Sequence, residues 1–210
     1  MIWLAWRQQR FAFIAAAVLV AVYGALATAA NYDAEYATIT QLLAGYLTIG
    51  VCMFWGAPLV ARDLEHGTHR LAWTQSKPRT HWLAARLAVA GIGALAAAAA
   101  VTAIVSLALP ASAVDPTRWY YYESHGLVPF ARVLFALALG AALGALTRHV
   151  HIAMAISAPI LGIVQLGGVR SLRENADVGF WQLQATEAAS YLAIAAILAA
   201  VTFFTVRRRG

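Results

Sequence analysis

Residues 82–109 read WLAARLAVAGIGALAAAAAVTAIVSLAL, an apolar run that a single charged residue, Arg86, interrupts. About 20 apolar residues suffice for a helix to cross the hydrocarbon of a bilayer, so this run is long enough to span a membrane. The whole chain shares this character, because 62% of its 210 residues are hydrophobic, 11% are charged, and its mean hydropathy is +0.69. A soluble domain carries about twice that share of charge. The composition therefore excludes a soluble or disordered protein and predicts an all-α integral membrane protein.

Five further stretches have the length and hydropathy of a transmembrane helix. With residues 82–109 they give six predicted spans: 11–30, 39–61, 82–109, 127–146, 150–169 and 188–206. The breaks between them hold nearly all the ionisable residues, which indicates one transmembrane domain over residues 1–210 and no separate soluble part. The turn between the fourth and fifth spans, at Arg148, is very short, so these two stretches could instead form a re-entrant pair.

The basic residues predict the orientation, since Lys and Arg gather on the cytoplasmic side of membrane proteins. With both ends of the chain cytoplasmic, the inner side holds eleven of the fifteen basic residues: Arg7, Arg10, Arg62, Arg70, Lys77, Arg79, Arg86, Arg148, Arg207, Arg208 and Arg209. The outer side holds Arg118, Arg132, Arg170 and Arg173, together with most of the acidic residues. We therefore expect cytoplasmic termini in a multi-pass protein of the plasma membrane. These patches also explain the net charge of +6 without any nucleic-acid partner.

Residues 62–81 form the only sizeable loop on the predicted inner side. Gly67 is expected to end a helical extension of the second span, because glycine tolerates the positive φ that a helix C-terminus often needs. Thr68 can then cap a short new helix, which Pro78 ends, and Thr80 can cap the third span. The sequence thus predicts a cytoplasmic elbow that carries a short surface helix.

Enzymatic chemistry finds little support in this sequence. The only lysine, Lys77, lies in no glycine-rich phosphate-binding loop, so we do not expect ATP to bind to this chain. His66 and His69, and likewise His149 and His151, are paired, but neither pair has a metalloprotease-type carboxylate–histidine motif. We therefore expect no metal site and no catalytic residues. Ion-coupled carriers usually place a carboxylate in mid-span, and its absence counts against that class.

A few residues within the spans call for comment. Arg132 is expected to snorkel to the outer interface as a structural anchor, the alternative being a contact with substrate. Gly140 and Gly144 form a small-xxx-small face suited to close helix contact. Pro159 should kink the fifth span, and Ser157 could bond the carbonyl groups that the kink frees. Two interpretations stay open for these four last-named positions: helix packing, or the lining of a substrate pathway.

The segment FWGAPLVARDLEHGTHRLAWTQS, residues 54–76, resembles the end of the second span and the elbow of type-2 ABC exporter permeases. That family's pattern is a charged run ending in Glu-x-Gly-Thr, a short leucine-bearing helix, and then proline and a basic residue that open the third span. The matching residues are Arg62, Asp63, Glu65, Gly67, Thr68, Leu71, Pro78 and Arg86. The resemblance is strongest over residues 50–90, and the number of spans extends it over the whole chain.

The resemblance implies a type V exporter fold, with six spans, cytoplasmic ends and a coupling helix between spans two and three. Family members work as two six-span units with two ATP-binding subunits. The implied partners are an ABC ATP-binding subunit that holds ATP and magnesium, a second permease (identical or paralogous), and the bilayer. No cofactor and no enzymatic activity are implied for this chain. The residues implied to couple it to the ATPase are Arg62, Asp63, Glu65, Gly67, Thr68, Arg70, Leu71 and Trp73, with the last two as apolar anchors.

Two alternatives to an ABC exporter permease remain at the level of sequence. One is a membrane scaffold or immunity-type protein that transports nothing and uses the elbow to hold a partner. The other is a membrane enzyme that acts on lipid. The apolar span walls suit amphiphiles, drugs or lipids as substrates without choosing among them.

Overall fold

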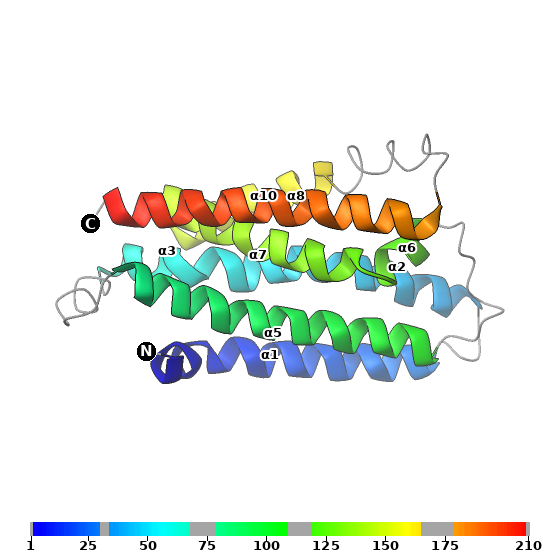
Figure 1. Cartoon of the computed structure of the whole chain (residues 1–210). Coiled ribbons are helices and arrows are strands. Elements are labelled where there is room, and N and C mark those ends of the chain that lie inside the picture. The colour runs from blue at the N-terminus through cyan, green and yellow to red at the C-terminus, as the bar shows by residue number, and fades with distance from the viewer. Residues whose placement is uncertain (1, 30–33, 68–78, 109–118, 165–178, 209–210) are drawn as a thin grey trace.

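The computed structural model describes residues 2–29, 34–67, 79–108, 119–164 and 179–208. All the regular structure in these residues is helical, and the helices pack side by side into an elongated bundle (Figure 1). Five of the described helices are long and apolar enough to cross a membrane, and α8 (Val150–Ile163) is apolar but shorter. The all-helical membrane fold is confirmed. The sixth span stays a prediction, since residues 165–169 of the expected fifth span lie outside the described part of the chain.

The helices extend beyond the predicted spans at most ends. They are α1 (Ile2–Ala29), α2 (Ala34–Gly50), η2 (Val51–Gly56), α3 (Ala57–Glu65), α5 (Arg79–Ala108), α6 (Trp119–Ser124), α7 (Val128–Thr147), α8 and α10 (Phe180–Arg208). Hydropathy finds only the apolar middle of a helix, whereas the backbone hydrogen bonds continue into the polar interface. For the same reason Thr80 does not cap α5, which already includes Arg79.

The second predicted span is one continuous helix, which we call span two, built from α2, η2 and α3. Its middle, Val51–Gly56, is a π-helix rather than an α-helix. The predicted limits 39–61 fall inside this helix, because its first residues and its last turn are too polar to count as a span. Hydropathy carries no information on helix type, so the sequence did not predict this change.

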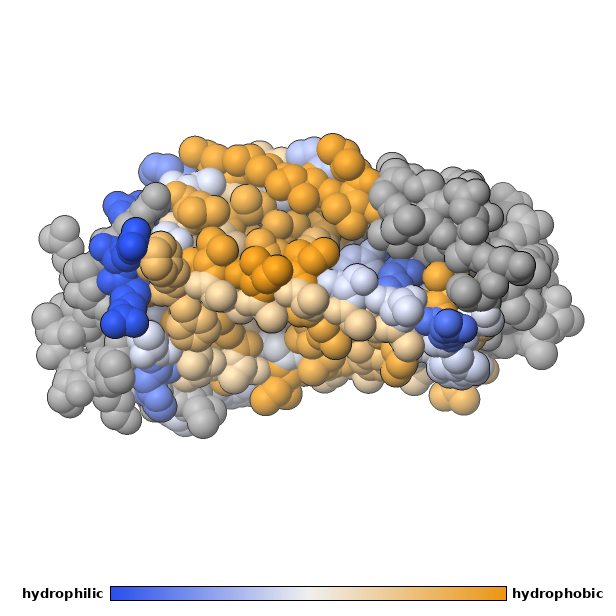
Figure 2. Space-filling model, turned by 45° about the horizontal axis from the view of Figure 1, so that its top comes forward, coloured by the Kyte–Doolittle hydropathy of each residue, from blue (hydrophilic) through white to orange (hydrophobic). Residues whose placement is uncertain are grey.

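The bundle has two distinct ends. At one of them, the elbow end, α1 begins, α3 ends, α5 begins and α10 ends; at the other, the far end, α6 lies and α7 and α10 begin (Figure 1). Between the two ends the surface is a broad hydrophobic band, with hydrophilic residues gathered toward both (Figure 2). The ends of the described chain therefore lie on the same side of the apolar band.

Helix α7 is the centre of the bundle. It contacts α10, α3, η2, α5 and α8, and most of its residues are buried, whereas α1 is largely exposed. Arg148 follows α7 with a φ of 61°, and its amide donates to the Gly144 carbonyl at 3.0 Å. This left-handed residue turns the chain within two residues, so that α8 starts at Val150.

Candidate functional site

The described part of the elbow is the end of α3 and the start of α5. Helix α3 ends at Glu65, the His66 amide donates to the Arg62 carbonyl at 3.2 Å, and Gly67 has a φ of +68°. The expected positive φ at Gly67 is thus observed. Thr68, Arg70, Leu71, Trp73 and Pro78 lie outside the described residues, so the short coupling helix stays a prediction.

Asp63 and Arg86 join the two helices that flank the elbow. Their side chains form an ion pair and are 15% and 9% exposed, and Arg86 also donates to the Leu59 carbonyl at 3.0 Å. The Arg86 guanidinium lies over the Trp82 ring, 4.9 Å from its centroid. A largely desolvated arginine needs this set of partners, because an unpaired buried charge is strongly destabilising. The pair therefore ties α3 to α5.

Helix α1 joins the same network through an amide side chain. Gln9 Nε2 donates to the Arg86 carbonyl at 3.2 Å, and its Oε1 accepts from Trp55 Nε1 at 3.0 Å. Phe13 packs edge-on against Trp55, with ring centroids 4.9 Å apart. We call Gln9, Trp55, Asp63 and Arg86 the elbow clamp. It connects α1, span two and α5 at the elbow end.

Glu65 connects the elbow to α8. Its Oε2 accepts a hydrogen bond from the Val150 amide at 3.1 Å, and its Oε1 lies 3.7 Å from His149 Nδ1. A carboxylate at a helix N-terminus satisfies a free amide and interacts favourably with the helix dipole. This cap comes from another helix, so it holds the start of α8 against the end of α3.

The remaining coupling residues described by the structure differ in their surroundings. Arg62 is exposed on α3, whereas Asp63 is half-buried in its ion pair with Arg86. Glu65 is exposed apart from its contact with α8, and Gly67 is half-buried. Arg62 is therefore an outward-facing charge, whereas the carboxylates of Asp63 and Glu65 each contact another helix.

Gly140 and Gly144 of α7 lie against the backbone of span two. A Cβ added at Gly140 would come within 2.5 Å of the Cys52 carbonyl oxygen and 2.6 Å of the Ala57 nitrogen, and one at Gly144 would come within 2.5 Å of the Ala57 carbonyl oxygen. On the span-two side Gly56 is equally close, since its added Cβ would lie 2.8 Å from the Leu137 carbonyl oxygen. The two helices therefore touch backbone to backbone, a contact that only glycine permits.

Ser157 and Pro159 lie within α8, and Ser157 is fully buried. The expected repair of the carbonyl freed by Pro159 is wrong in detail. Proline at position 159 removes the hydrogen bond to the carbonyl four residues earlier, at Ala155, but the Ser157 hydroxyl donates to Met154 instead, at 2.8 Å. A serine hydroxyl two positions before the proline reaches back three residues along its own helix, which brings it to Met154 and not to Ala155.

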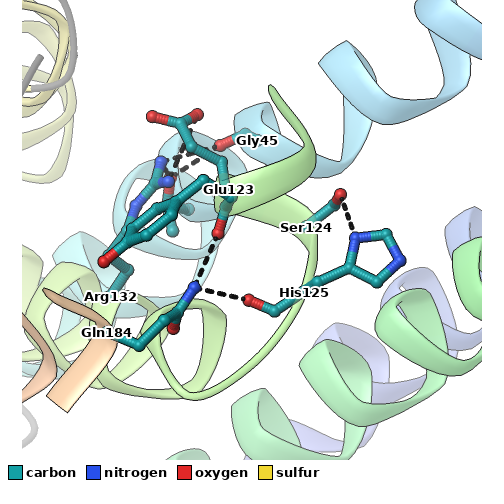
Figure 3. Close-up of polar contacts among 8 residues, drawn as sticks. Gly45, Glu123, Ser124, His125, Arg132 and Gln184 are labelled. Atoms are coloured by element: carbon teal, nitrogen blue, oxygen red, sulfur yellow. Dashed lines mark hydrogen bonds and ion pairs between the residues drawn. The ribbon is translucent and has the colours of Figure 1, made fainter. Parts of the chain in front are cut away.

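Arg132 corrects a second expectation, because it does not snorkel. Its side chain is 3% exposed, its Nη1 lies 3.2 Å from Glu123 Oε2, and its Nη2 donates to the Gly45 carbonyl at 3.3 Å (Figure 3). The hydroxyl of Thr48 lies 3.5 Å away. A carboxylate on the short helix α6 makes a buried position tenable for the arginine. The ion pair links α6 to α7 at the far end, and the hydrogen bond to Gly45 adds α2.

Gln184 of α10 connects three helices at the far end through hydrogen bonds. It is fully buried, and its Oε1 accepts from the amides of Leu127 and Val128 at 2.9 Å each. Its Nε2 donates to the His125 carbonyl at 3.0 Å (Figure 3). It also donates to the Tyr122 carbonyl at 3.2 Å. One amide side chain thus caps α7 and ties it to α6 and α10.

An apolar groove opens between α1 and span two. Its volume is about 610 Å³, and it is lined by the two helices and by Ala97 and Val101 of α5. Phe54 and Trp55 of the π-helix form part of its wall. No group of three or more potential metal ligands occurs among the described residues.

A family model described as "ABC-2 membrane transporter related" matches residues 2–173, most of the 210-residue chain. No curated protein and no solved structure matches the sequence.

Proposed function

The chain belongs to the ABC-2 membrane transporter related family, and we propose that it is the permease subunit of an ATP-driven exporter. It is a multi-pass membrane protein with a permease-type role. Such a family implies an ABC ATP-binding subunit as a partner. In the proposed assembly two permeases, identical or paralogous, form the pathway through the plasma membrane, and separate subunits bind ATP and magnesium.

The contacts of the elbow carry this proposal. A motor outside the membrane can act only on segments that protrude from it, and a push becomes helix motion only where those segments are rigidly joined to the spans. Asp63 pairs with Arg86 of α5, and Glu65 accepts the Val150 amide of α8. A force on the elbow would therefore reach span two, α5 and α8 together, and α1 through Gln9.

The chemistry of the substrate follows from the groove and the span walls. The groove between α1 and span two is lined almost wholly by apolar side chains. The described spans offer no cluster of metal ligands, and their buried ions at Arg86 and Arg132 are already paired. We therefore propose that the substrate is hydrophobic or amphiphilic.

The decisive experiment is purification of the tagged chain from its own cells, followed by an assay of ATP hydrolysis. We expect an ATP-hydrolysing subunit to co-purify, and the isolated chain to hydrolyse no ATP. Leu71→Asp places a charge in the proposed apolar contact with that subunit and should abolish co-purification. Arg173→Ala, on the predicted outer side, is the matched control and should leave the complex intact.

Two outcomes would contradict the proposal. A chain that purifies without any ATPase and binds another partner through the elbow would be a scaffold. A chain that moves a fluorescent amphiphile across vesicle membranes on an ion gradient alone would be a secondary transporter.

A further inference from the structure

The π-helix in span two lies where one backbone donor of the helix is missing. The Ala57 amide donates to the Cys52 carbonyl, five residues earlier, where an α-helix would use a carbonyl four residues earlier. Pro58 follows directly, and it has no amide hydrogen to give to the Phe54 carbonyl. The proline thus interrupts the α-helical pattern at the point where the helix widens to hold one extra residue.

The two halves of span two both pack against α7, but their polar side-chain contacts come from different helices. The far half is held by Arg132 of α7, which donates to the Gly45 carbonyl at 3.3 Å and lies 3.5 Å from the Thr48 hydroxyl. The elbow half is held by Arg86 of α5, through Asp63 and the Leu59 carbonyl, and by α8, through Glu65. The segment between these two sets of contacts is the π-helix, Val51–Gly56.

We propose that Val51–Gly56 is a joint at which the elbow half of span two moves relative to the far half. The joint is a property of this chain, and only the force that drives it rests on the proposed function. A π-turn has weaker hydrogen bonding than an α-helix and can pass its extra residue along the chain, so it is the natural place for such a movement.

The surroundings of the joint permit this movement. On one face Gly56 meets the backbone of Leu137 and Gly140 in α7, a contact without interlocking side chains. On the opposite side Phe54 and Trp55 line the apolar groove, and Trp55 is hydrogen-bonded to Gln9 of α1 at 3.0 Å. A turn at the joint would therefore change the wall of the groove and carry α1 with it.

The joint can be tested on the chain alone. Nitroxide labels at positions 46 and 62, both exposed, lie on either side of the π-helix, and a Cys52→Ala background removes the native thiol. Labels at positions 185 and 201, also exposed and equally far apart in sequence, lie on the uninterrupted α10. Both pairs should be about 24 Å apart along their helices. The measurement is the distance distribution by pulsed electron spin resonance in lipid nanodiscs.

We expect a broad or two-component distribution for positions 46 and 62 and a narrow one for positions 185 and 201. Deletion of Met53 combined with Pro58→Ala removes the extra residue and restores the missing amide, so it should straighten span two with both anchors still in register. The 46–62 distribution should then become narrow. Pro58→Ala alone keeps the extra residue, so it should leave the distribution broad.

If the distance distributions of the two label pairs are equally wide in the chain without the deletion, the proposed joint is wrong. If the deletion does not fold, amide hydrogen exchange of the unaltered chain decides: residues 51–57 should exchange on the order of tenfold faster than residues 191–197 of α10, and equal rates would also overturn it.

The effect of ATP on the 46–62 distance distribution tests the proposed function separately from the joint. Because the label at position 62 replaces Arg62, an implied coupling residue, the labelled complex must first hydrolyse ATP at the rate of the unlabelled complex. With the ATP-binding subunit bound to such a labelled chain, ATP should shift the 46–62 distribution, and it should not do so in the straightened variant. A broad distribution that ATP does not shift supports the joint and contradicts ATP-driven transport.

Discussion

Arg86 lies one to two turns inside α5, where its charge is compensated by Asp63 and its guanidinium also meets the Leu59 carbonyl and the Trp82 ring. Buried ion pairs cost desolvation energy and are often worth little as a source of stability. Removing only one partner is strongly destabilising, because the remaining charge stays buried without compensation. The pair therefore fixes the relative position of α3 and α5 more than it adds to the free energy of folding.

Single and double substitutions of Asp63 and Arg86 should distinguish the effect of the ion pair on stability from its effect on ATP-driven transport. Asp63→Leu alone strands Arg86 and should cost about 3 kcal/mol, at the low end for a buried pair because Asp63 keeps 15% of its side chain exposed. Asp63→Leu with Arg86→Met replaces both charges by apolar groups and should restore most of that stability. We expect the double variant to stay uncoupled, since apolar contacts do not fix the orientation of the elbow. Thermal unfolding in detergent measures the first effect and ATP-dependent transport the second. A double variant with normal transport would show that the pair has no part in coupling.

Gly140 allows a direct test of the backbone contact between α7 and span two. Gly140→Ala forces a methyl group to within 2.8 Å of three backbone atoms of span two. We expect it to destabilise the protein by about 1–3 kcal/mol through overpacking. The control is Gly162→Ala on α8, where an added Cβ meets nothing within 4 Å. There the loss of glycine flexibility should stabilise the helix by up to about 1 kcal/mol. Equal unfolding midpoints for the two variants would mean that the helices separate easily.

At the scale of the elements, hydropathy predicted most of the helices, because a helix in lipid must satisfy its own backbone and span a fixed thickness. The predicted spans 82–109 and 127–146 lie within a few residues of α5 and α7. The π-helix escaped prediction although Pro58 lies within the predicted second span. A proline removes one backbone donor, but a missing donor can kink an α-helix as well as accompany a π-turn, so Pro58 alone does not indicate a π-helix.

The polar contacts between helices were not predictable in the same way. Glu123 lies in a segment that hydropathy assigns to a loop, so nothing in the sequence marks it as the partner of Arg132. Gln184 precedes the predicted sixth span and gave no signal of its four hydrogen bonds. Such pairs depend on which helix faces meet, and a periodic pattern along one chain does not contain that information.

The cap of α8 by Glu65 predicts a local effect on one helix. Glu65→Ala removes the acceptor of the Val150 amide and the partner of His149, so the first turn of α8 should open more often. We expect amide hydrogen exchange at Val150 to rise on the order of tenfold while α5 is unchanged. Arg62→Ala is the control, because it removes an exposed charge from the same end of α3. If both variants raise amide exchange in α8 equally, the stability of the first turn of α8 depends on the net charge at this end of α3 and not on the Glu65 carboxylate.

At the scale of the whole molecule, charge follows the two ends of the bundle. Among the described residues, eight arginines and two carboxylates, Asp63 and Glu65, lie on elements at or near the elbow end, whereas Arg132, Glu123 and Glu187 lie toward the far end. The eight arginines are Arg7, Arg10, Arg62, Arg79, Arg86, Arg148, Arg207 and Arg208. The positive-inside rule then predicts that the elbow end faces the cytoplasm. Helix α7 runs from the far end to the elbow end, and α10 again begins at the far end (Figure 1).

The turn after α7 decides between a crossing and a re-entrant pair. If α7 crosses the membrane completely, a cysteine in place of Arg148 is accessible from the cytoplasm only, because Arg148 is exposed at the elbow end. A cysteine in place of Leu127, which is 50% exposed at the start of α7, should react only from outside and serves as the control. Both variants use the Cys52→Ala background, and an impermeant maleimide is applied to intact cells and to inverted vesicles. Reaction of position 148 in inverted vesicles alone, with position 127 reactive in intact cells alone, requires that α7 cross the bilayer and that the chain return before α10. A position 148 that reacts from neither side, or from outside, means that α7 and α8 enter and leave by the same face, and the six-span topology is then wrong.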